Sequence, residues 1–145
     1  PEKLELEDAK KLYSWIYDKL KEIIPDMTAP SCFPSGIFLG STWNPDGVYE
    51  VGQALGDEAR AFGINILLGT PNVNIHRDIR NGRLFEGYSE DPFLAASLAP
   101  ELVKGVQSKD VAANVKHFAA NHQETNRMNI NEFIPERALQ EIYYP

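Results

Sequence analysis

The sequence predicts an α/β fold in which helices alternate with parallel strands. Two apolar runs, at residues 64–68 and 111–118, are short, rich in aliphatic residues and bounded by turn residues, as is typical of buried strands. Amphipathic helices are expected over residues 44–62 and 91–106, so each of these helices is followed by a strand. Because helix and strand alternate over short connections, we expect the strands to be parallel.

Another helix precedes this alternating part, at residues 4–24. Its apolar residues recur at three- and four-residue spacing, and Pro25 ends it. Acidic residues in the first turns and lysines near the end suit the helix dipole. An amphipathic helix is more often a packing element than a partner-binding site. We therefore expect residues 1–28 to form an additional N-terminal amphipathic helix and residues 29–145 to form the α/β domain.

The alternating part begins after an irregular stretch. Residues 30–43, interrupted by proline and glycine, are expected to be irregular or to form a short strand. Asn44 is expected to cap the next helix, with Pro45 at the first helical position. Gly63 is expected to end this helix, because glycine enters the left-handed region readily. The continuous aliphatic run at residues 64–68 then indicates a strand that is buried on both faces.

The later helices carry one irregularity. Asp91 and the proline after it open a helix that contains Pro100, and a proline inside a helix costs about 3 kcal/mol. The helix is therefore expected either to break near Ser97 or to hold strain there. A final helix is expected from Ile134 to Tyr143.

Polar segments follow both predicted strands. Residues 69–92 form a long, highly charged stretch, and long structured loops in compact domains are usually functional. Lys116 and His117 lie at the end of the second strand, the rim where parallel sheets place their ligands. Successive side chains of a strand point to opposite faces, so both residues reach one ligand only if the backbone turns there.

Composition excludes several function classes. The net charge of −7 and the pI near 4.9, without any cluster of lysine and arginine, argue against a nucleic-acid partner. The single cysteine, Cys32, cannot form an internal disulfide. No stretch is apolar enough to span a membrane and no signal peptide is visible, which favours a soluble and slightly favours a cytoplasmic protein. The start at Pro1 is also compatible with processing of the N-terminus.

Several long motifs occur in a fixed order. They are F-P-S-G and S-T-W-N-P, then N-I-H-R-D-I-R-N-G-R-L-F-E-G-Y-S-E-D-P, K-H-F-A-A-N-H-Q-E-T-N-R-M and E-R-A-L-Q-E-I-Y. Together they resemble the N-terminal domain of family 3 glycoside hydrolases of the β-glucosidase type, over residues 32–145. The resemblance implies a partial TIM-barrel-like arrangement, with about three parallel strands in this chain.

The resemblance also implies an activity. Family members of this type hydrolyse terminal non-reducing β-D-glucosyl residues with retention, which implies a β-glucoside or short β-gluco-oligosaccharide as ligand and no cofactor. The family's nucleophile, an aspartate in a Ser-Asp-Trp motif, and its acid/base glutamate have no counterpart in this chain, and neither has its sugar-binding Asp-Gly-Pro motif. No catalytic residue is therefore expected here. The residues that match the family's glucose-binding positions are Arg83, Lys116, His117 and Arg127.

Two other site types are compatible with the composition. A pair of catalytic carboxyl groups is disfavoured because acidic residues near arginines are normally ion-paired, which lowers their pKa. A metal site is disfavoured because the spacing of the candidate ligands does not match a zinc motif. The candidate carboxyl groups are Glu86, Glu90, Asp91 and Glu124, and the candidate metal ligands are His76, His117, His122, Asp78 and Glu124.

A partial barrel raises the question of a partner. It leaves a sheet edge and an apolar face open, which a parallel sheet does not tolerate. We expect a complementary polypeptide, a second copy of the chain or the leading helix to cover that face. The functional alternative to a contribution to a β-glucosidase is an inactive, truncated or repurposed fragment that acts as a folding or assembly unit.

Overall fold

The computed structural model describes residues 6–23 and 29–145 and divides the chain into two compact units, residues 1–31 and 32–145. In the first unit, helix α1 spans Leu6–Ile23, as the apolar spacing predicts. Its side chains at Tyr13 and Ile16 are 66% and 43% exposed. The expected helix end at Pro25 lies outside the described residues. No helix in the part of the chain that the structure describes is long and apolar enough to cross a membrane.

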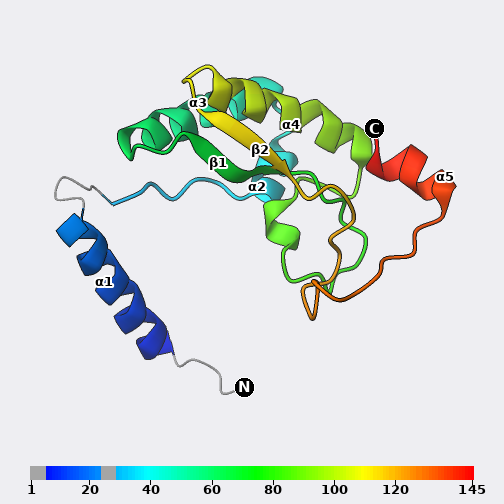
Figure 1. Cartoon of the computed structure of the whole chain (residues 1–145). Coiled ribbons are helices and arrows are strands. Elements are labelled where there is room, and N and C mark those ends of the chain that lie inside the picture. The colour runs from blue at the N-terminus through cyan, green and yellow to red at the C-terminus, as the bar shows by residue number, and fades with distance from the viewer. Residues whose placement is uncertain (1–5, 24–28) are drawn as a thin grey trace. The chain divides into compact units, whose positions relative to one another are not determined.

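The second unit is an α/β layer built on a parallel sheet, so the predicted fold class is confirmed (Figure 1). Strands β1 and β2 pair in parallel, and the crossover between them contains helix α4. The elements are α2 (Gly36–Thr42), α3 (Pro45–Ala61), β1 (Ile66–Asn72), the 3-10 turn η1 (Leu84–Glu86), α4 (Pro92–Gln107), β2 (Ala112–Lys116), α5 (Glu136–Ala138) and the π-helical turn η2 (Leu139–Tyr143).

The helix boundaries follow the predicted capping residues. Asn44 Oδ1 accepts a hydrogen bond from Gly47 N at 3.2 Å and caps α3. Past the end of this helix, Gly63 has a φ of 72°, the left-handed conformation expected of it. Asp91 Oδ1 caps α4 by accepting from Phe93 N at 2.9 Å. Helix α4 continues through Pro100 without a break, so the first of the two expected alternatives, an interruption near Ser97, is absent.

Helices α3 and α4 pack against each other at unusually close range. A Cβ atom at Gly105 of α4 would overlap the backbone oxygen of Tyr49 in α3, so only glycine permits this approach. Behind the contact, Val106 and Val111 are 0% and 1% exposed and pack against Leu67 of β1. The two helices therefore cover one face of the sheet and hold both strands in place.

Three details of the predicted secondary structure are wrong. The described residues contain two parallel strands instead of about three. Residues 36–42, expected to be irregular or a strand, form α2, because Gly36 and Gly40 let this short helix pack directly on the backbone oxygens of Glu86 and Tyr88. Neither strand is buried on both faces, since Leu68 of β1 is 78% exposed on the face away from the helices and every residue of β2 is at least partly exposed.

Candidate functional site

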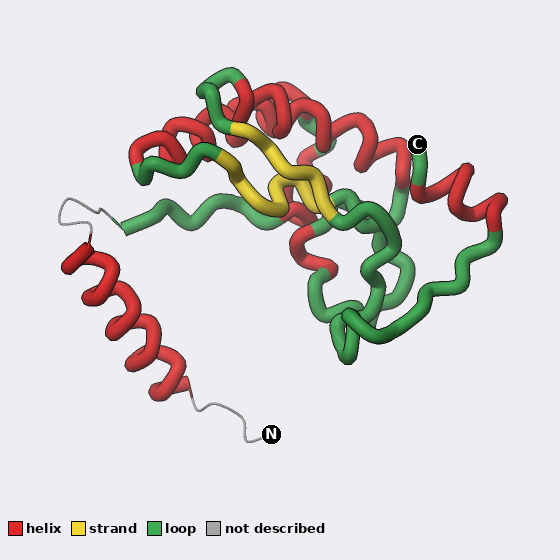
Figure 2. Tube along the Cα trace, viewed as in Figure 1, coloured by secondary structure: helices red, strands yellow, loops and turns green. Residues whose placement is uncertain are grey.

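The carboxyl ends of β1 and β2 meet at one edge of the sheet. Asn72, the last residue of β1, pairs in register with Lys116, the last residue of β2. The segments that follow the two strands therefore start side by side, and Figure 2 shows the loops gathered beyond these strand ends. Two segments far apart in the sequence, residues 73–92 and 117–135, build this part of the molecule together.

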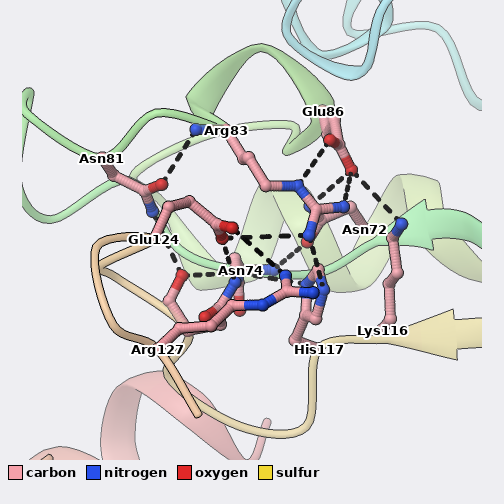
Figure 3. A network of polar contacts seen from close by, with 10 residues as sticks. Asn72, Asn74, Asn81, Arg83, Glu86, Lys116, His117, Glu124 and Arg127 are labelled. Carbon is pink, nitrogen blue, oxygen red and sulfur yellow. Dashed lines mark hydrogen bonds and ion pairs between the residues drawn. The ribbon is translucent and has the colours of Figure 1, made fainter. Parts of the chain in front are cut away.

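Arg83 and Lys116 meet at the carboxylate of Glu86 (Figure 3). Arg83 donates from Nε to Glu86 Oε1 and from Nη2 to Glu86 Oε2, both at 2.7 Å. Lys116 Nζ lies 3.4 Å from Glu86 Oε2. The side chains of Arg83 and Glu86 are 21% and 22% exposed, so the pair is mostly shielded from solvent. Such a bidentate pair fixes the plane of the guanidinium group.

His117 lies on the other side of the same arginine. Arg83 Nη1 is 3.1 Å from His117 Nε2, and His117 Nδ1 is 3.4 Å from Asn74 Nδ2. Because a guanidinium group only donates, His117 Nε2 is the acceptor. The peptide bond between Lys116 and His117 is cis, and both side chains face the loop that carries Arg83. The side chains of these two neighbouring residues thus reach one site.

Arg127 joins the cluster through Glu124. Arg127 Nη1 lies 3.1 Å from Glu124 Oε2, and Arg83 Nη1 lies 3.8 Å from Glu124 Oε1. Asn121 Nδ2 donates to the same Glu124 Oε1 at 2.6 Å, which holds the carboxylate between the two arginines. All four residues predicted for the site therefore lie in one connected network, with Arg127 at its more exposed margin.

Buried asparagines support the network and were not predicted. Asn74 and Asn81, 7% and 6% exposed, both donate from Nδ2 to the backbone oxygen of Asn121, at 3.0 and 3.2 Å. Asn81 Oδ1 also accepts from the backbone N–H of Arg83 at 3.0 Å. These bonds tie the loop after β1 to the loop after β2. For Asn74, the available sequence signal was its position, with Asn72, shortly after the aliphatic run at residues 64–68.

The charges of the cluster are set by its contacts. Hydrogen bonds from Arg83, with help from Lys116, lower the pKa of Glu86 to about 2, so this carboxyl group stays ionised. The same pairing raises the pKa of Arg83. Burial, and then the positive charges of Arg83 and Lys116, lower the pKa of His117. Around Arg83 the site therefore presents an ionised carboxylate that is paired with two cations, Arg83 and Lys116, and beside them an imidazole whose neutral form is favoured, while Glu124 and Arg127 form a second pair at the margin.

The alternative site types find little support in the geometry. Glu86 is ion-paired as expected, and its lowered pKa does not suit an acid catalyst. Asp91 is engaged in capping α4. Within residues 6–23 and 29–145, no group of three or more histidine, cysteine or acidic side chains converges as metal ligands would. His122, one of the candidate metal ligands, instead has its Nε2 atom 2.7 Å from the hydroxyl of Tyr143.

Comparison with known proteins assigns the family. The family model described as "Glycosyl hydrolase family 3 N terminal domain" matches residues 14–144. The chain belongs to glycoside hydrolase family 3. The match begins inside α1, ahead of the motifs that start near Cys32, and the division of the chain at residue 28 stays a prediction.

Relatives of this family 3 chain include enzymes with two different names. It is 52% identical over 113 residues to beta-glucosidase B of Emericella nidulans, which covers 78% of this chain and 13% of the relative. It is 46% identical over 122 residues to an exo-alpha-(1->6)-L-arabinopyranosidase of Bifidobacterium longum, covering 84% of this chain and 16% of that protein. The chain thus spans about a sixth or less of the length of these relatives.

Solved structures of family 3 enzymes share the fold. Beta-glucosidase 3B from Thermotoga neapolitana, in complex with alpha-D-glucose, matches with a TM-score of 0.75 and 53% identity. The match covers 78% of this chain and 16% of that chain. The predicted TIM-barrel-like family fold is therefore confirmed for the part of the domain that this chain contains.

Proposed function

We propose that this chain supplies the sugar-binding part of a retaining β-glucosidase that acts on terminal non-reducing β-D-glucosyl residues. The observation that carries the proposal is the convergence of Arg83, Lys116 and His117 at the carboxyl ends of two parallel strands. Parallel α/β folds place their ligands at this edge. The similarity to beta-glucosidases, one of them solved with glucose, supports this choice over an inactive assembly unit.

The side chains suit the hydroxyl groups of a pyranose. The guanidinium of Arg83 and the ammonium of Lys116 are positively charged hydrogen-bond donors, while the neutral imidazole of His117 has one N–H donor and one acceptor nitrogen, Nε2, which already accepts from Arg83. Neighbouring sugar hydroxyls also donate and accept, so this mixture can bind several of them at once. Arg127, held by Glu124 at 3.1 Å, would orient the margin of the site.

The bond-breaking groups lie outside this chain in the proposal. A retaining glycosidase needs a nucleophile and an acid/base whose carboxyl groups are about 5–5.5 Å apart. Glu86 is ion-paired with Arg83 and its pKa of about 2 makes it a poor proton donor. Residues of the longer family proteins, on the same polypeptide or on another, would supply the missing pair.

We propose that the part of the protein that carries those residues packs on the uncovered face of the sheet. On this face Ile66 and Leu68 are 57% and 78% exposed. A groove of about 530 Å³ between α4 and the C-terminal turn is lined mainly by apolar side chains such as Val103, Phe118 and Ile142. We propose that a complementary polypeptide or a second copy of the chain covers these surfaces. Native mass spectrometry should then show a complex, and a lone 16.3 kDa species would contradict this proposal.

D-glucose titration of the purified chain tests the proposed function. Isothermal titration should detect binding of D-glucose and no comparable heat with D-sorbitol, whose open chain cannot present a ring of fixed hydroxyls. The same chain should not hydrolyse p-nitrophenyl β-D-glucoside above the buffer rate, because the carboxyl pair is missing. Equal heats with D-glucose and D-sorbitol, or no heat with either, would argue against a glucose site in this chain.

A further inference from the structure

Glu86 lies between the two cations of the proposed sugar site. Its Oε2 atom is shared, at 2.7 Å from Arg83 Nη2 and 3.4 Å from Lys116 Nζ (Figure 3). The buried amide of Asn72 approaches the same oxygen, with Nδ2 at 3.4 Å. Glu86 thus links the end of β1, the end of β2 and the loop that carries Arg83.

We propose that Glu86 is a positioning residue, which holds Arg83 and Lys116 at a fixed spacing so that their remaining N–H groups face the sugar. This inference rests on the proposed function of the two cations. Two like charges this close repel each other, and a shared carboxylate offsets that repulsion while fixing both side chains. Glu86 need not touch the ligand to have this effect.

The contacts also define which donors are left for a ligand. Nε and one N–H of Nη2 in Arg83 are directed at Glu86. Nη1 instead lies 3.1 Å from His117 Nε2 and 3.8 Å from Glu124 Oε1. The N–H groups of Arg83 that are directed at neither Glu86 nor His117, one on Nη1 and one on Nη2, are therefore the donors left for a sugar. Lys116 directs one of its three N–H groups at Glu86 and keeps the others available.

A carboxylate is required for this role. An amide of the same shape can accept a hydrogen bond through its oxygen, but its NH2 group would point at a cation that also only donates. Both oxygens of Glu86 are used as acceptors, so Glu86→Gln loses one of the two Arg83 bonds and removes the negative charge. The loop backbone can remain folded, because Asn81 Oδ1 independently holds the N–H of Arg83.

Nuclear magnetic resonance of the ligand-free chain tests the inference. In the wild type the Nε–H signal of Arg83 should be resolved and slow to exchange, and Glu86→Gln should speed its exchange at least several-fold. The pKa of His117 should fall further in this variant, because Glu86 and Glu124 oppose the effect of Arg83 and Lys116. Glu101→Gln is the matched control, since Glu101 pairs with Lys104 at 2.6 Å on α4 without contacting the site.

A second variant, Glu86→Asp, and titration with D-glucose distinguish failure of this inference from failure of the proposed function. Glu86→Asp keeps the charge but shortens the side chain, so the exchange of Arg83 Nε–H should speed up while the pKa of His117 changes less than in Glu86→Gln. D-glucose affinity should fall about five- to tenfold in Glu86→Gln and remain unchanged in Glu101→Gln. An Arg83 signal that is unchanged in both Glu86 variants overturns this inference, whether or not the wild type binds D-glucose. Absence of D-glucose binding in the wild type contradicts the proposed function instead.

Discussion

Lys116→Ala should weaken the binding of D-glucose by about 10- to 100-fold. The substitution removes a charged donor at the end of β2, and hydrogen bonds to charged groups are worth about 1.5–3 kcal/mol. It leaves the strand pairing intact, because the bonds of β2 to β1 and from Val73 N to Lys116 O are made by the backbone. Isothermal titration with D-glucose measures the loss, and circular dichroism checks that the fold is kept.

Lys104→Ala provides the control for this prediction. Lys104 lies on α4 with its side chain 62% exposed and pairs with Glu101, away from the site. Removing it should leave D-glucose affinity within twofold of the wild type. If both lysine variants lost affinity equally, the effect would reflect net charge, and the assignment of Lys116 to the site would fail.

Leu98→Ala should have the largest effect on stability, lowering the free energy of unfolding by about 2–5 kcal/mol. Leu98 is 1% exposed in the core between α4 and the elements around it, and truncating a buried leucine removes apolar burial and leaves a cavity. A domain of this size has a total stability of only about 5–15 kcal/mol. Urea denaturation followed by circular dichroism measures the change in the midpoint.

Phe93→Ala in the same helix tests whether the stability loss of Leu98→Ala comes from burial or from a change in helix propensity. Phe93 is one of the apolar residues of this helix, yet the structure shows it 76% exposed. Alanine also favours a helix at least as well as phenylalanine does. The unfolding midpoint should therefore hardly change in Phe93→Ala. A loss as large as that of Leu98→Ala would mean that another part of the protein covers Phe93.

The order of the elements could be predicted because local signals are strong there. Asn44 and Asp91 each precede a proline and an apolar stripe, and both cap helices as predicted. The parallel pairing of the two strands follows from the alternation of helices and strands. Helix α2 could not be predicted, since it depends on the close approach of Gly36 and Gly40 to a backbone more than forty residues away in the sequence.

In the site, too, residues with local sequence signals could be predicted, whereas residues that depend on long-range contacts could not. Arg83, Lys116 and His117 were singled out by motif and by their place after a strand. The structure places Arg83 Nη1 3.1 Å from His117 Nε2 and joins Lys116 to Arg83 through the shared carboxylate of Glu86. The roles of Asn74 and Asn81 were missed. Both depend on the backbone oxygen of Asn121, which only the folded chain brings near, and asparagines after a strand otherwise indicate a turn.

D-glucose is proposed to bind at the carboxyl ends of β1 and β2. The three histidines allow a direct measurement, since His117 lies in the proposed site whereas His122 contacts Tyr143 and His76 lies beside Gly87. Their ring signals can be followed by nuclear magnetic resonance during a D-glucose titration. We expect saturable shifts at His117 with much smaller changes at His76 and His122. Shifts confined to the other two histidines, with His117 unchanged, would contradict it.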